Sequence, residues 1–190
     1  MPMNAYHRRY CASARYARRV ADELLPWVLD GVDLGDDVLE IGPGLGVTTR
    51  LLTQRVSRLT ALEVDEGFAA RLSREFADRD GAVRIVFGDG ALMPFPDGRF
   101  SATVCFTMLH HVPSVDAQDR LFAEAHRALR PGGVFAGSDS QPSLRFRLIH
   151  LFDTMVVVDP ATLHGRLTAA GFTNVEVELR RSVRFKAYKA

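Results

Sequence analysis

The sequence predicts an α/β protein, a doubly wound and mostly parallel sheet with helices on both faces. Apolar runs with the length of buried strands alternate along the chain with segments whose apolar residues recur at helical spacing. The chain then ends in two runs of alternating apolar and polar residues joined by Arg180 and Arg181, which is typical of an antiparallel hairpin. Together these patterns predict a seven-stranded sheet that finishes in a C-terminal antiparallel hairpin.

The predicted strands and helices follow one another in the order that a parallel sheet needs. The five parallel strands are expected at 38–41, 59–64, 83–87, 100–106 and 134–137, and the hairpin strands at 175–179 and 183–187. Helices are expected between these strands. One covers 48–54, and a second has the apolar face Phe68, Leu72 and Phe76. A third has the apolar face Leu121, Ala125 and Leu129 and is stopped by Pro131, and the last begins at Asp159 and is closed by Gly171.

The N-terminal region is predicted to be a basic helix that follows a flexible tail of about four residues. Tyr16, Val20 and Leu24 recur at four-residue spacing, and Pro26 is expected to end or kink the helix. The basic face has two interpretations, a solvated surface or a lid that attracts an acidic substrate. Its arginines are Arg8, Arg9, Arg15, Arg18 and Arg19.

Length and composition bound the class of protein. A chain of 190 residues that is 47% hydrophobic is predicted to form one domain. A formal net charge of +1 gives no argument for a nucleic acid or a membrane as partner. No signal-peptide pattern and no apolar run near the ~18 residues of a membrane span is present in the sequence, so a cytoplasmic protein is expected. Cys11 and Cys105 match no metal or redox spacing.

A glycine-rich turn directly after the first predicted strand is the strongest functional signal. Its glycines are Gly42, Gly44 and Gly46, so the third comes one position earlier than in a dinucleotide-binding G-x-G-x-x-G sequence. Glu63, at the end of the second strand, is placed to accept the hydroxyl groups of a ribose. Glu40 precedes the turn and would repel a pyrophosphate but suit an ammonium group. S-adenosylmethionine combines an ammonium group, a ribose and an adenine without a phosphate.

Five ordered segments resemble the motifs of class I S-adenosylmethionine-dependent methyltransferases. They are 38–46, Glu63, 88–97, 108–112 and 129–133. The resemblance covers about residues 36–139 and is closest to the small-molecule group that includes ubiquinone and menaquinone biosynthesis methyltransferases. It implies a Rossmann-like fold and transfer of a methyl group to a small-molecule acceptor by in-line displacement.

The resemblance also implies which residues bind S-adenosylmethionine. The glycines would approach its methionine and ribose, Glu40 its amino group and Glu63 its ribose. Asp89 would accept from the adenine amino group, although Asp-Gly is also ordinary turn chemistry. The residues implied in cofactor binding are Glu40, Gly42, Gly44, Gly46, Glu63, Val64, Asp89, Gly90, Phe106 and Thr107.

A general base is needed only if the acceptor carries a proton of high pKa. His110, in the fourth of these motifs, is the candidate for that role, and the alternative is that it packs against or caps the following helix. Other candidates are His111, Asp139, His150 and Asp153. Because His110 and His111 have no partner at a recognised ligand spacing, no metal site is expected.

Other functions remain as alternatives. Residues 62–65 and 69–72 resemble rRNA adenine dimethyltransferases, but 106–109 read Phe-Thr-Met-Leu where those enzymes carry an Asn-Leu-Pro-Tyr-like motif. An RNA methyltransferase is therefore the alternative enzyme, and nucleic acid is not the expected partner. The further alternatives are a non-catalytic protein that binds S-adenosylmethionine and a nicotinamide-dependent dehydrogenase.

The predicted organisation is one methyltransferase domain, 1–190, in three parts. Residues 1–35 form a helical lid, 36–139 the cofactor-binding core, and 140–190 a substrate-covering segment with the last helix and hairpin. Within 141–158, Arg145 and Arg147 are candidates to bind an acidic group. The apolar residues there predict either a packed helix or a pocket wall for an apolar or aromatic acceptor, and they are Phe146, Leu148, Ile149, Leu151, Phe152, Met155 and 156–158.

Overall fold

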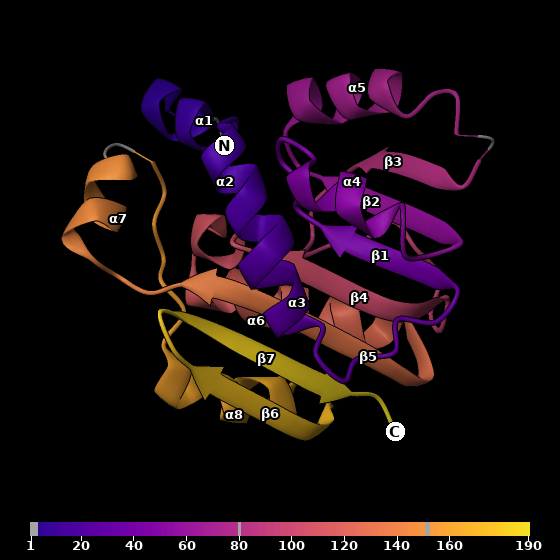
Figure 1. Cartoon of the computed structure of the whole chain (residues 1–190). Helices are drawn as coiled ribbons and strands as arrows, with labels where there is room; N and C mark the ends of the chain where they lie inside the picture. The colour runs from indigo at the N-terminus through magenta and orange to yellow at the C-terminus, as the bar shows by residue number, and fades with distance from the viewer. Residues whose placement is uncertain (1–3, 80, 151–152) are drawn as a thin grey trace.

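A seven-stranded sheet runs through the centre of the protein (Figure 1). The computed structural model describes residues 4–79, 81–150 and 153–190. The strands are β1 Asp37–Ile41, β2 Arg58–Glu63, β3 Val83–Phe87, β4 Phe100–Phe106, β5 Leu129–Ser140, β6 Thr173–Leu179 and β7 Ser182–Tyr188. Their order in the sheet is β3-β2-β1-β4-β5-β7-β6, which confirms the predicted Rossmann-like α/β architecture.

The strand order creates a crevice at the carboxyl ends of the central strands. β1 pairs in parallel with both β2 and β4, so the connections leave it in opposite directions. In such sheets the carboxyl ends of the strands diverge at this switch point and leave room for a ligand. β7 pairs antiparallel with β5 and with β6, as the alternating pattern of the C-terminal runs predicts.

Helices pack on both faces of the sheet. They are α1 Ala5–Cys11, α2 Ala14–Arg19, the π-helix η1 Val20–Leu24, α3 Leu25–Val28, α4 Val47–Leu52, α5 Glu66–Glu75, the 3-10 helix η2 Leu109–His111, α6 Val115–Ala128, α7 Leu144–Ile149 and α8 Pro160–Ala169. In one apolar cluster Phe122 of α6 and Leu163 of α8 pack with Phe135 of β5. In the other, Val20 of η1 packs with Val38 of β1, and Figure 1 shows α2 and α3 crossing in front of the sheet.

The N-terminal region differs from the single predicted helix. Ser13 interrupts it, because the Ser13 hydroxyl accepts a hydrogen bond from Tyr16 N–H at 3.2 Å and begins α2 as an N-cap. Pro26 lies in the first turn of α3, directly after the π-helical turn η1, and does not end the helical region. Asn4 caps α1 and is not part of a tail, since its Oδ1 accepts from His7 N–H at 2.8 Å. Residues 1–3 of that predicted tail lie outside the described residues.

The boundary between α6 and β5 also differs from the prediction. α6 ends at Ala128, before Pro131, and β5 begins at Leu129, which pairs with Phe100. The pairing shifts register between Phe100 and Ala102, so an irregularity joins this early segment to the regular ladder. A local apolar pattern predicts only the regular part of such a strand.

None of the helices in the described part of the chain has both the length and the apolarity that a membrane crossing requires.

Candidate active site

A cavity of about 450 Å³ opens where β1 and β4 diverge. It extends from the glycine turn after β1 to the histidines that follow β4, and α1 and α2 contribute His7 and Tyr16 to its wall. The predicted site residues in the wall are Gly42, Gly44, Glu63, Val64, Asp89, Gly90, Phe106, Thr107 and His110. The tertiary structure therefore brings together predicted residues from the carboxyl ends of β1, β2, β3 and β4.

The glycine turn has two distinct structural roles. Gly42 has φ +67°, and a Cβ on it would lie 3.0 Å from the side chain of Met108. Because glycine has no Cβ, the turn and Met108 can lie side by side in the cavity wall. Gly46 lies outside the cavity wall. A Cβ on Gly46 would lie 2.5 Å from Cδ2 of Leu72. The third glycine therefore allows α5 to pack against the turn.

Glu63 is held at the cavity wall by the backbone around it. Its Oε2 accepts a hydrogen bond from Gly44 N–H at 2.8 Å, and its Oε1 accepts from Asp65 N–H at 2.9 Å. Burial raises the pKa of Glu63, whereas these hydrogen bonds oppose the rise. Each carboxylate oxygen can accept a second hydrogen bond, so this fixed group suits a ligand with two neighbouring hydroxyls.

Glu40 lies behind the glycine turn and not in the cavity wall. It is 1% exposed and accepts a hydrogen bond from the hydroxyl of Thr48, which does line the cavity. Its Oε2 has no hydrogen-bond partner of good geometry among the described residues. Burial raises the pKa of Glu40 to about 7, and the charge of Glu63 adds to this rise. Two buried carboxyl groups beside the turn disfavour a phosphate and suit a cationic group.

Val64 and Asp89, two of the residues predicted at the adenine end, are exposed. Val64 is 54% exposed, so a flat apolar ring can pack on it. Asp89 Oδ1 accepts a hydrogen bond from Ala91 N–H at 2.8 Å, which is the turn interaction that the Asp-Gly sequence also predicts. Gly90 is buried, and a Cβ on it would lie 2.9 Å from Cδ1 of Leu121.

The end of β4 joins the sheet to the N-terminal helices. Phe106 is buried in the cavity wall, and Thr107 follows it with φ +51°, a backbone conformation uncommon for a residue with a Cβ. Thr107 N–H donates to the Ser138 carbonyl at 2.8 Å, and its hydroxyl lies 3.0 Å from that of Tyr16. The Tyr16 contact holds α2 over the cavity.

His110 is fixed by Asp139 on the neighbouring strand β5. Its backbone N–H donates to Asp139 Oδ2 at 2.8 Å, and its Nδ1 lies 2.5 Å from Asp139 Oδ1. Its Nε2 lies 3.1 Å from Nε2 of His150. A carboxylate at Nδ1 selects the tautomer whose Nε2 is basic, so the predicted candidate base is oriented by its surroundings.

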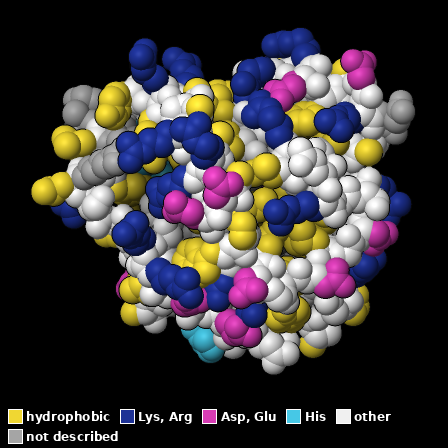
Figure 2. Space-filling view, viewed as in Figure 1, with side chains coloured by type: hydrophobic (Ala, Val, Ile, Leu, Met, Phe, Trp, Pro, Cys, Tyr) yellow, Lys and Arg dark blue, Asp and Glu magenta, His cyan; other side chains and the backbone are white. Residues whose placement is uncertain are grey.

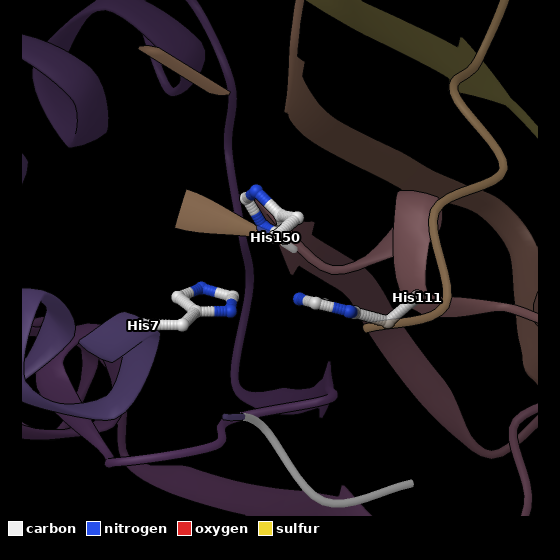
Figure 3. A group of neighbouring side chains, drawn as sticks. All are labelled: His7, His111 and His150. Atoms are coloured by element: carbon white, nitrogen blue, oxygen red, sulfur yellow. The ribbon is translucent and has the colours of Figure 1, made fainter. Parts of the chain in front are cut away.

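Three histidines that are far apart in the sequence meet beside His110. His7 from α1, His111 from η2 and His150 from the end of α7 face a common space in Figure 3. One ligand atom from each lies within 4.8 Å of those of the other two. The sequence prediction of no metal-ligand group overlooked them because it tested spacing along the chain, and no local signal connects residue 7 with residue 150.

Burial sets the protonation of these three rings. It lowers the pKa of His7, that of His111 to about 2 and that of His150 to about 4. The neighbouring histidines add to this effect, because positive charges repel one another. All three imidazoles are therefore neutral at neutral pH.

Among its described side chains, the segment after β5 supplies one apolar residue to the cavity wall. Phe146 of α7 is buried there, whereas Leu148 is 68% exposed. α7 is thus a helix with one packed face, and Arg147 is exposed. Of the other residues predicted in this segment, Leu151 and Phe152 lie outside the described residues, as do the side chains of Arg145 and Ile149.

The basic face of the N-terminal helices lies on the outside of the protein. Figure 2 shows Lys and Arg side chains gathered over α1 and α2. Arg8, Arg9, Arg15 and Arg18 are exposed, and Arg19 is exposed but also contributes to the cavity wall. Most of this charge is therefore solvated, and of these five arginines Arg19 is the one in the cavity wall.

Comparison with known proteins places the chain in a family. Residues 39–137 match the family model described as a methyltransferase domain, which is more than half of the chain. The chain therefore belongs to this family, the class I S-adenosylmethionine-dependent methyltransferases. The prediction of S-adenosylmethionine as the cofactor is confirmed at the level of the family. The dehydrogenase alternative is not supported.

Relatives in the family differ in what they act on. The chain is 34% identical over 151 residues to the biotin biosynthesis bifunctional protein BioHC of Teredinibacter turnerae, a match that covers 74% of this chain and 26% of that protein. It is 37% identical over 97 residues to a probable ribosomal RNA small subunit methyltransferase A of Methanospirillum hungatei, covering 50% and 35% respectively. The chain thus spans about a third or less of the length of these curated relatives.

Solved structures show the same fold over the whole chain. The PH0226 protein of Pyrococcus horikoshii superimposes with a TM-score of 0.82 and covers 100% of both chains at 15% sequence identity. The C-terminal hairpin and the N-terminal helices thus belong to the shared architecture.

Proposed function

We propose that the chain transfers a methyl group from S-adenosylmethionine to a small-molecule acceptor that binds beside the histidines. The observation that carries this proposal is the continuous cavity from the glycine turn to His110. Its volume of about 450 Å³ lies in the range of small-molecule sites. α1 and α2 cover it, so the acceptor end is shaped by the chain itself.

The residues present fit S-adenosylmethionine at each of its parts. Thr48, which lines the cavity and donates to Glu40, would accept from the ammonium group, and the buried carboxyl group of Glu40 would act on it from behind the turn. Glu63 would hold the ribose hydroxyls, with Val64 and Asp89 at the adenine. Gly42 and Gly44 would lie along the methionine, with Phe106 and Thr107 at the end near the acceptor. When bound, S-adenosylmethionine supplies an activated methyl group and a neutral thioether leaving group.

The chain contributes alignment and exclusion of water. In-line displacement requires the acceptor atom, the methyl carbon and the sulfur to lie on one line, and a rigid pocket supplies this order before the reaction. The contacts Tyr16–Thr107 and His7–Asp153, at 3.0 and 2.9 Å, hold the N-terminal helices over the cavity. Residues 1–35 would then act as the lid, 36–139 as the cofactor-binding core, and 140–190 would complete the acceptor side.

His110 is the residue we assign to proton removal when the acceptor carries a proton. Asp139 holds its Nδ1, so Nε2 is the atom that would take the proton. Asp139 is buried and would stabilise the imidazolium that forms.

An RNA acceptor is the second candidate, favoured by the relatives that are described as ribosomal RNA methyltransferases. Against it stands the near-neutral charge of the chain, because binding to a phosphate backbone needs a basic surface. A third candidate is a protein that binds the cofactor and transfers nothing.

Labelled methyl transfer distinguishes these candidates. The chain is incubated with methyl-labelled S-adenosylmethionine and either total RNA or a fraction of small metabolites below the size of proteins and nucleic acids. Label in the small-molecule fraction supports the proposal, and label only in RNA replaces it with the second candidate. Binding of S-adenosylhomocysteine by calorimetry without any transfer supports the third. Gly44→Val is the control for the cofactor site, because it should abolish both binding and transfer.

A further inference from the structure

Four of the six histidines in the chain gather at the acceptor end of the cavity. They are His7, His110, His111 and His150, and all of them contribute to the cavity wall. The other two lie elsewhere: His126 packs against Phe172 and His164 is exposed on α8. Methyl transfer requires at most one proton acceptor, so the proposed function leaves three of these histidines without a role in the chemistry.

The three histidines beside His110 have the arrangement of a metal-ligand set. The ligand atoms of His7, His111 and His150 lie within 4.8 Å of one another, and Figure 3 shows the rings converging from separate elements. Nitrogen ligands around a tetrahedral zinc ion lie about 3.4 Å apart, since each Zn–N distance is about 2.0–2.1 Å. Small side-chain movements would bring the three nitrogen atoms to that spacing.

Each of the three rings is oriented by an acceptor at a second nitrogen or by nearby backbone. Nδ1 of His7 lies 2.9 Å from Oδ2 of Asp153, and Nδ1 of His150 lies 2.8 Å from the Phe146 carbonyl. The ring of His111 is hydrogen-bonded to the backbone of Thr154. Metal-binding histidines almost always have such an outer partner, which fixes the tautomer and directs the other nitrogen at the metal. His7 and His150 therefore offer Nε2 to the common space.

His150 also contacts His110, the proposed base. Nδ1 of His110 faces a carboxylate, and Nδ1 of His150 faces a carbonyl oxygen. The two Nε2 atoms face each other at 3.1 Å. Such a contact is repulsive unless a proton or a metal ion lies at one of the nitrogens.

We propose that His7, His111 and His150 bind a divalent transition metal ion, with zinc as the best fit to three imidazole ligands. Sites with three protein ligands and one open position are typical of catalytic zinc, whereas structural zinc has four protein ligands. Carboxylates Asp139 and Asp153 lie next to the cluster and offset part of the added charge.

His7, His111 and His150 all line the cavity, so the open position of the metal would face the acceptor, an inference that rests on the proposed methyltransferase function. A metal ion in this position would lower the pKa of a hydroxyl or thiol group bound to it and hold that group in place. The acceptor class is then a compound whose nucleophilic oxygen or sulfur binds zinc, such as a phenol or a thiol. Exposed amines that are protonated at neutral pH would be excluded.

Metal titration of the full chain tests the site. Calorimetry with Zn²⁺, and the visible absorption of Co²⁺, should show one ion bound per chain with tetrahedral Co²⁺ character. His7→Ala, His111→Ala and His150→Ala should each weaken Zn²⁺ binding by about 100-fold or more, and Asp153→Asn by about 10- to 100-fold. His164→Ala removes an exposed histidine outside the cluster and should leave the affinity unchanged.

Binding of S-adenosylhomocysteine is measured on the same variants. Unchanged cofactor binding shows that a variant is folded. If His111→Ala is not folded, His111→Gln replaces it. Absence of Zn²⁺ binding to the wild-type chain, or affinity retained in all the cluster variants, overturns the metal site and leaves the proposed function intact. Zn²⁺ binding without S-adenosylhomocysteine binding supports the metal site and contradicts the proposed function.

Discussion

The carboxylate of Glu63 at the end of β2 accepts a hydrogen bond from the backbone N–H of Gly44 at 2.8 Å. This contact joins the glycine turn after β1 to the neighbouring strand and fixes the position of a buried carboxyl group in the cavity wall. A single acidic residue therefore both shapes the turn and faces the ligand. Its removal should therefore affect both the turn and the bound ligand.

Glu63→Ala is expected to weaken binding of S-adenosylhomocysteine by about 10- to 100-fold, since a hydrogen bond to a charged group contributes about 1.5–3 kcal/mol. Calorimetry measures the affinity. Glu66→Ala, which removes an exposed carboxylate in the first turn of α5, is the matched control and should bind normally. Equal affinities in the two variants would contradict the assignment of Glu63.

Glu40→Gln should change how stability depends on pH. The folded state raises the pKa of Glu40 from 4.5 to about 7, so it binds the proton more tightly than the unfolded chain does. The stabilisation that comes from this tighter proton binding is fully present below pH 4.5. It falls by about 3 kcal/mol in total as the pH rises to about 7. The variant has no such loss.

Urea denaturation at several pH values measures this effect in the ligand-free protein. The difference in unfolding free energy between Glu40→Gln and wild type should grow in favour of the variant from pH 4.5 to 7 and then stay constant. Taking the difference cancels the contributions of titrating groups that do not interact with Glu40. Parallel pH profiles for the two proteins would show that Glu40 titrates normally.

Gly46→Ala should destabilise the protein through packing. The residue has φ +75°, and the new Cβ would lie 2.5 Å from Cδ2 of Leu72. Gly98→Ala is the matched control, because Gly98 has φ +64° and a Cβ added there would meet nothing within 4 Å. Gly98→Ala should cost about 1 kcal/mol from backbone conformation alone, and Gly46→Ala about 1–3 kcal/mol more. Equal losses in urea denaturation would show that α5 yields to the added methyl group.

Tyr16→Phe should loosen the N-terminal helices over the cavity. The substitution keeps the ring but removes the contact between the Tyr16 and Thr107 hydroxyls, which is worth about 1 kcal/mol. Amide hydrogen exchange in α2 should become about fivefold faster, with little change in β4. Tyr6→Phe is the control, since Tyr6 is 65% exposed. Identical exchange in both variants would mean that the hydroxyl contact does not hold the lid.

Much of the fold could be predicted because its signals are local. The strand 100–106 is an apolar run buried along its whole length, and the hairpin alternates residue by residue. The N-terminal region was harder, because Tyr16, Val20 and Leu24 keep a helical spacing into a π-helical turn. That spacing also gives no sign of the cap at Ser13. Side-chain capping and hydrogen-bond register decide such breaks, and apolar spacing does not report them.

The sheet, the glycine turn and the family follow from the sequence alone, since strand periodicity and ordered motifs are properties of neighbouring residues. Three other features depend on tertiary packing: Gly46 makes room for α5, Glu40 lies behind the turn, and His7 and His150 meet His111. These outcomes depend on distances between segments that are far apart in the chain. Folding sets those distances through the packing of whole elements, so no spacing along the sequence records them.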